Sequence, residues 1–212
     1  MAFLRQAFAR FDVEVEPVAL SDALRADPDY SAPIPDLRYE GRCNLRIRRR
    51  GRHPERTLLF NAHVDVVPPS EGMDDAFEGR EENGILYGRG ACDNKGSIAA
   101  LYRLLELLQE RRVEPEGDLV LHLVVEEENG GNGTLAMVRR GETARGCIVL
   151  EPTEGRVLTS IRGAVWFRIA FAGVAGHSGQ AGRTRSALLM AHTAITKLTD
   201  YQRRLRAASR GI

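Results

Sequence analysis

Three short apolar runs alternate with two helical patterns, and this alternation constrains the fold of the chain more than any other feature. The apolar runs are LLFNAHV at 58–64, DLVLHLVV at 118–125 and GCIVL at 146–150. Residues 97–112 carry apolar side chains at helical spacing, and 135–141 have a shorter helical pattern. Strands that alternate with helices in this way are typical of an α/β fold. We therefore predict a sandwich of helices around a mostly parallel central sheet.

The residues before this core predict further elements of the same domain. Residues 2–11 have the pattern of a short amphipathic helix, and 43–49 (CNLRIRR) alternate as expected for an antiparallel edge strand. A long irregular stretch, 68–84, follows the first apolar run. A loop of that length in a compact domain is usually functional.

The character of the chain changes near residue 160. A strand-like segment runs into a glycine-rich turn, and one long helical pattern then occupies 186–209. One strand and one helix are too little to bury a core of their own. We place a domain boundary here, with a first domain at 1–161 and the incomplete beginning of a second at 162–212.

Carboxylates follow the end of every predicted central strand. They are Asp65, Glu126, Glu127, Glu128 and Glu151, with Asp93 in the loop GACDNKG. Open α/β sheets bind ligands outside the carboxyl ends of their strands. Acids that meet there repel one another unless a cation neutralises them. Taken singly, each is an ordinary solvated loop residue, but their shared position favours a metal site.

His63 and Asp65 stand two residues apart at the end of the first apolar run. Residues i and i+2 of a strand point to the same side, so the two side chains can act together. One interpretation is a hydrogen-bonded pair that only completes the strand end. The other is a metal-binding histidine that a carboxylate orients. Histidine with acids and without thiolates suits Zn²⁺, Co²⁺ or Mn²⁺.

Charge and cysteine content exclude several classes of protein. Lysine and arginine number 30 and aspartate and glutamate 29, a net charge of +1, which gives no overall field toward nucleic acid or an anionic membrane. Three widely spaced cysteines predict no disulfide framework and fit a reducing compartment. The N-terminus has no signal-peptide pattern and no segment has the length of a membrane span. We therefore predict a cytoplasmic protein.

Five motifs together resemble a known family. They are NAHVDVVP, YGRGACDNKG, EEENGGNG, LEPT and AGHSG, in that order. The chain is similar to the zinc-dependent deacylases and exopeptidases that include acetylornithine deacetylase, succinyl-diaminopimelate desuccinylase, aminoacylase and carboxypeptidase G. The resemblance implies a metallohydrolase that cleaves the amide bond of an N-acyl amino acid or small peptide. It also implies a second, smaller α+β lid and dimerisation domain, and a homodimer.

The resemblance implies two divalent ions, Zn²⁺ or Co²⁺, and a role for each matching residue. His63 would bind the first ion, with Asp65 holding its imidazole. Asp93 would bridge the two ions, and Glu151 would complete the first site.

The acidic triplet allows two assignments. In the first, Glu127 is the general base and Glu128 binds the second ion. In the alternative, Glu126 is the base and Glu127 the ligand. The spacing Glu126-Glu127-Glu128-Asn129-Gly130 fits the family pattern in the first assignment.

The second predicted domain carries two further candidates. The resemblance assigns His177, in AGHSG, the task of donating a hydrogen bond to the oxyanion of the reaction, often from the partner subunit of a dimer. Its alternative is a turn histidine without a role. Arg162 could pair with a substrate carboxylate, although a surface arginine is the more ordinary interpretation.

The sequence departs from the family pattern in one respect. The family takes a histidine for its second metal ion from a segment after the lid domain, and His192, within a helical pattern, does not match it. We therefore expect one complete metal site, and a second with only Asp93 and Glu128. This favours a fragment, a truncated product or one half of a split enzyme that needs a complementing C-terminal chain. A non-catalytic metal-binding remnant is the alternative function.

A dinucleotide-binding protein is a further alternative, suggested by GRGACDNKG. The glycine spacing of that fingerprint is absent, and the acids would repel a pyrophosphate.

Overall fold

The computed structural model describes residues 1–31, 34–161, 163, 167–180 and 182–209. The chain divides into two compact units, Met1–Leu158 and Thr159–Ile212. That these units are a catalytic domain and a lid or dimerisation domain stays a prediction. None of the described helices is long and apolar enough to cross a bilayer.

The first unit contains both helices and strands. Its helices are α1 (Ala2–Phe8), α2 (Gly96–Glu110) and α3 (Asn132–Arg139), with a 3₁₀ turn η1 (Asp22–Ala26) and a π-helical turn η2 (Ala91–Lys95). Its strands are β1 (Glu14–Ala19), β2 (Cys43–Arg49), β3 (His53–His63), β4 (Arg80–Glu82), β5 (Ile85–Tyr87), β6 (Gly117–Val124) and β7 (Gly146–Val149). The predicted α/β fold is confirmed.

Five of these strands form the central sheet, in the order β1-β2-β6-β3-β7. Strands β6, β3 and β7 are parallel, so their carboxyl ends lie at one edge, whereas β1 and β2 pair antiparallel on the other side. The prediction that 43–49 form an edge strand is wrong. Strand β1 pairs with β2 along nearly its whole length, from Glu14 opposite Arg48 to Ala19 opposite Cys43. Strands β4 and β5 form a separate hairpin.

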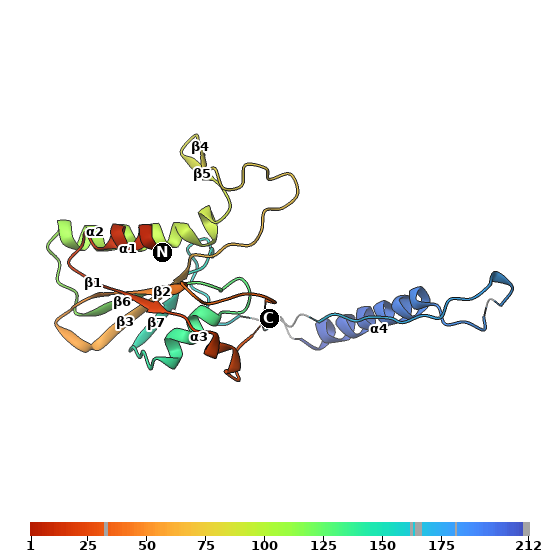
Figure 1. Cartoon of the computed structure of the whole chain (residues 1–212). Helices are drawn as coiled ribbons and strands as arrows, with labels where there is room; N and C mark the ends of the chain where they lie inside the picture. The colour runs from red at the N-terminus through yellow and green to blue at the C-terminus, as the bar shows by residue number, and fades with distance from the viewer. Residues whose placement is uncertain (32–33, 162, 164–166, 181, 210–212) are drawn as a thin grey trace. The chain divides into compact units, whose positions relative to one another are not determined.

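Helices cover both faces of the sheet, and strand alternation decides which side chains meet them. Figure 1 shows α1 and α2 along one face and α3 against the other. Leu121 and Leu123 of β6 belong to the core cluster that contains Phe8 of α1 and Leu105 of α2. Val124 instead packs in a smaller cluster with Met137 and Val18.

Strand β3 brings its last residue to the α3 face. Asn61 donates a hydrogen bond from Nδ2 to Oγ1 of Thr134 in α3, at 3.2 Å. Because His63 stands two residues further along the same strand, its side chain leaves the sheet on the same face.

The second unit contains the short turn η3 (Ser178–Gln180) and the long helix α4 (Ala187–Ala208). Ser186 begins α4 by accepting a hydrogen bond from the amide of Leu189, at 3.3 Å, as an N-cap serine does. The long helical pattern is therefore confirmed. The strand-like segment before it has no strand among its described residues, 167–171, since a strand needs a partner to pair with.

Candidate metal centre

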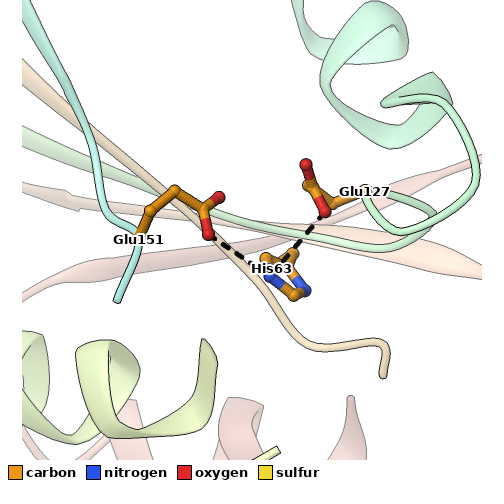
Figure 2. A group of neighbouring side chains, drawn as sticks. All are labelled: His63, Glu127 and Glu151. Carbon is orange, nitrogen blue, oxygen red and sulfur yellow. Dashed lines mark ion pairs between the residues drawn. The ribbon is translucent and has the colours of Figure 1, made fainter. Parts of the chain in front are cut away.

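The carboxyl ends of β3, β6 and β7 bring a histidine and several carboxylates together. His63 is the last residue of β3, Glu127 and Glu128 lie in the loop after β6, and Glu151 follows β7. Asp93 lies in η2, at the entry to α2. Figure 2 shows His63 between Glu127 and Glu151.

The Nε2 atom of His63 is the centre of this arrangement. It lies 2.9 Å from Oδ1 of Asp93. Carboxylate oxygens of Glu127 and Glu151 each lie 3.9 Å from the same nitrogen. Among the described residues, two sets of three side chains have ligand atoms within 4.8 Å of one another: His63, Glu127 and Glu151, and His63, Asp93 and Glu128. His63 belongs to both sets.

Asp65 fixes the imidazole of His63 at the nitrogen that faces away from the carboxylate cluster. The side chain is 1% exposed, and its Nδ1 lies 3.0 Å from the backbone oxygen of Asp65 and 3.5 Å from the carboxylate. A hydrogen bond to this oxygen places a proton on Nδ1 and leaves Nε2 for the cluster. Asp65 therefore holds the ring mainly through its backbone, a detail that the sequence prediction did not contain.

Opposing influences act on the pKa of His63. Burial by itself would lower this pKa, but the hydrogen bond with Asp93 and the negative charges of Asp65 and Glu127 outweigh burial and raise it. The imidazole is therefore in a strongly anionic environment.

Burial raises the pKa of Glu127; His63 lowers it, and the charges of neighbouring carboxylates raise it further, with a net increase. The pKa of Glu151 is raised in the same way, first by burial and then by Glu127. In the described part of the first unit, His63 is the one basic side chain that forms an ion pair with Glu127 or Glu151. Like charges gathered around one imidazole nitrogen are the setting that a divalent cation stabilises, so the donor set fits a metal ion.

The carboxylate of Asp65 has a second task, which sequence reasoning missed. Its two oxygens accept hydrogen bonds from the backbone amides of Glu127 and Glu128, at 3.2 and 3.1 Å. These bonds tie the loop after β6 to the end of β3. No local pattern could reveal them, since they join residues about sixty positions apart in the sequence.

The acidic triplet is divided by the fold. Glu127 and Glu128 join the sets around His63, whereas Glu126 is 4% exposed and turned into the interior. Its carboxylate accepts hydrogen bonds from Tyr39 and Asn132. This geometry favours the assignment with Glu127 and Glu128 over the one with Glu126 as base.

The remaining candidates lie in the second unit. His177 is exposed, and its Nδ1 accepts a hydrogen bond from the amide of Gly179 at 3.1 Å. His192 lies within α4. Arg162 lies outside the described residues.

Comparison with known proteins gives one family. The sequence profile of peptidase family M20/M25/M40 matches residues 59–198. A deformylase of N-formyl-4-amino-5-aminomethyl-2-methylpyrimidine from Bacillus subtilis is 40% identical over 101 residues, which are 46% of this chain and 24% of that protein. Succinyl-diaminopimelate desuccinylase of Paracoccus denitrificans is 33% identical over 174 residues, 76% of this chain and 45% of that enzyme.

Solved structures agree in fold. A tripeptidase from Staphylococcus aureus has a TM-score of 0.58 at 18% identity, covering 92% of this chain and 49% of its own. An aminopeptidase PepT from Bacillus cereus has a TM-score of 0.58 at 22% identity, with 92% and 50% covered. At these identities the likeness establishes the fold alone. The chain spans less than half the length of these curated relatives.

Proposed function

Because the chain belongs to peptidase family M20/M25/M40, we propose that it is a metal-dependent hydrolase that cleaves the amide bond of an N-acyl amino acid or a small peptide. The observation that carries this proposal is the position of His63 Nε2 within 3.9 Å of carboxylate oxygens from Asp93, Glu127 and Glu151.

The residues of the cluster divide into metal ligands and supporting groups. His63, Asp93 and Glu151 would hold a first ion, and Asp93 with Glu128 would hold a second. Zn²⁺ and Co²⁺ both suit these nitrogen and oxygen donors. When bound, such ions act as Lewis acids that make water more acidic and polarise a carbonyl. Asp65 is hydrogen-bonded both to the His63 ring and to the amide of Glu127, so it fixes the position of the ring relative to the loop after β6.

Glu127 is the group that we propose as general base. Its carboxylate is 42% exposed and faces the same space as His63 Nε2, so it can take a proton from water and pass it to the leaving amine. Burial and the charges of its acidic neighbours raise the pKa of Glu127, which makes it a stronger base than an ordinary surface carboxylate.

The finer parts of the proposal concern substrate and assembly. The relatives' names describe removal of formyl or succinyl groups and cleavage of peptides, so an acylated amine is the shared substrate. An acetyl group, as in acetylornithine deacetylase, is one candidate acyl group. We propose that His177 donates to the oxyanion, that Arg162 meets a substrate carboxylate, and that the active form is a cytoplasmic homodimer.

A second candidate function is a metal-binding chain that hydrolyses only together with a complementing chain. The match covers 45% of the Paracoccus desuccinylase.

One experiment tests both. The 212-residue chain, and a chimaera in which it replaces the matching part of the Paracoccus desuccinylase, are loaded with Zn²⁺ or Co²⁺ and assayed on N-formyl, N-acetyl and N-succinyl amino acids and on dipeptides. We expect hydrolysis that a chelator abolishes. If the chimaera is active and the 212-residue chain is not, the second candidate is supported. If both proteins are folded and metal-loaded but hydrolyse no substrate of the panel, both candidate functions are contradicted.

A further inference from the structure

Glu126 is a buried carboxylate next to the proposed base, but it does not take part in the cluster. Its backbone φ is +62°, a conformation that residues with side chains seldom adopt. This turns its side chain into the interior while Glu127 and Glu128 join the sets around His63.

Two buried side chains hold the Glu126 carboxylate. The hydroxyl of Tyr39 donates to Oε2 at 2.6 Å, and Nδ2 of Asn132 donates to the same oxygen at 3.3 Å. Tyr39 is 1% exposed and Asn132 fully buried. Burial, and after it the hydrogen bond to Glu126, raises the pKa of Tyr39, so the hydroxyl keeps the proton that it donates.

Asn132 links the same loop to the N-terminal part of the chain. Its Oδ1 accepts from the amide of Ser31 at 3.1 Å, and its Nδ2 donates to the Ser31 oxygen at 2.9 Å. Ser31 Oγ donates to the oxygen of Gly130 at 2.6 Å. A Cβ on Gly130 would stand 2.3 Å from that Oγ, so the two segments approach as closely as glycine allows.

The loop from Glu126 to Gly131 is therefore held from two sides. Asp65 binds the amides of Glu127 and Glu128 on the side of the metal ligands. Tyr39, Ser31 and Asn132 bind the loop on the interior side. Among the described residues, Oε1 of Glu126 has no hydrogen-bond partner. A buried carboxylate costs free energy unless it is fully bonded, so stability alone does not account for an acid at this position.

We propose that Glu126 is a positioning residue that, through Tyr39 and Asn132, sets the loop in the conformation that turns Glu127 and Glu128 toward His63. The effect on metal binding rests on the proposed function. The effect on the conformation of the loop does not depend on it.

The test uses the 212-residue chain with two substitutions that remove one oxygen each from the network. Tyr39→Phe deletes the hydroxyl that holds Glu126, and Ser31→Ala deletes the bond to Gly130 at a partly exposed site. Tyr102→Phe is the matched control, since its hydroxyl lies in α2 and contacts Arg10. Two quantities are measured. The first is the Co²⁺ affinity, by titration. The second is the rate of amide hydrogen exchange in residues 126–133 of the metal-free protein.

We expect Tyr39→Phe and Ser31→Ala to weaken Co²⁺ binding by about 10–100-fold, the usual effect of removing a partner behind the ligands. The loop peptide should exchange faster in both variants. Glu126→Gln should bind Co²⁺ nearly as well as the wild type, because its amide oxygen can accept the same hydrogen bonds. Tyr102→Phe should change neither quantity.

Unchanged affinity and exchange in both Tyr39→Phe and Ser31→Ala would overturn the inference and leave the proposed function standing. Loss of Co²⁺ binding in Glu126→Gln would also overturn it, because Glu126 would then act as a ligand itself. If the wild type binds no metal while both variants exchange faster, the fixing of the loop is supported and the metal centre is refuted.

Discussion

The two nitrogen atoms of His63 have different partners, and this difference determines what the residue can do. Nδ1 faces Asp65 and Nε2 faces the carboxylates. The pairing of His63 with Asp65 could be predicted from their spacing, because a strand points both residues to one side. The bonds from Asp65 to the amides of Glu127 and Glu128 could not, since they depend on how distant strands pair.

Neighbouring glutamates in the loop after β6 should respond differently to the same substitution. Glu127→Gln keeps shape and hydrogen bonding but cannot accept a proton at neutral pH. In the form that hydrolyses the substrate, turnover should fall by about 10²–10⁴ while metal content stays. Glu128→Gln should reduce occupancy of the second ion, because a neutral amide is a poorer ligand for a dication. Metal analysis beside the activity assay separates the two.

The opposite pattern, with metal lost in Glu127→Gln and kept in Glu128→Gln, would support the other assignment, in which Glu126 is the base and Glu127 the ligand. Glu81→Gln, which changes an exposed glutamate of β4, serves as the control and should alter neither quantity.

At the scale of elements, the parallel strands place the site. The apolar runs and the acids after them predicted β3, β6, β7 and the edge where their ends meet. The position of β2 was not predictable, since an alternating pattern is the same for any strand with one solvated face. The segment that contains Tyr39 has no regular pattern, so its approach to the loop after β6 left no signal in the sequence.

The core under α1 and α2 should depend strongly on β6. Leu121 is fully buried there, and Leu121→Ala should lower the free energy of unfolding of the first unit by about 2–5 kcal/mol. Leu86→Ala, in the β4–β5 hairpin where Leu86 is 60% exposed, should change it by less than about 0.5 kcal/mol. Urea denaturation of both variants measures the difference. Equal midpoints would show that the sheet does not form this core.

An ion pair between Asp27, which follows η1, and Arg139 of α3 predicts a pH dependence. A hydrogen bond from Arg139, with a further one from the Asp29 amide, lowers the pKa of Asp27 from 3.8 to about 2. Because the pKa is lower in the folded protein, the stabilisation is complete above 3.8 and is lost as the pH falls toward about 2. Asp27→Asn should therefore lose less stability than the wild type over this acidic range. Thermal unfolding at a series of pH values checks this, and parallel curves would contradict it.

At the scale of the whole molecule, the cluster residues of the first unit come from segments nearly ninety positions apart, from His63 to Glu151. The motif order predicted which residues these are. The contribution of the second unit, with His177, was predicted from the resemblance alone and stays a proposal. The division of ligands between two ions depends on side-chain positions that no sequence spacing determines.

The central claim is that His63 organises a metal centre. The most direct measurement is calorimetric titration of the chelator-treated chain with Zn²⁺ for the wild type, His63→Ala and the control His53→Ala, which changes an exposed histidine at the other end of β3. We predict that the wild type and His53→Ala bind Zn²⁺ alike. His63→Ala, folded by its circular dichroism spectrum, should lose tight binding, because His63 is the proposed nitrogen ligand of the first ion and lies in both groups of candidate side chains. A wild type that takes up no Zn²⁺, or a His63→Ala variant that binds it as tightly, would contradict the account.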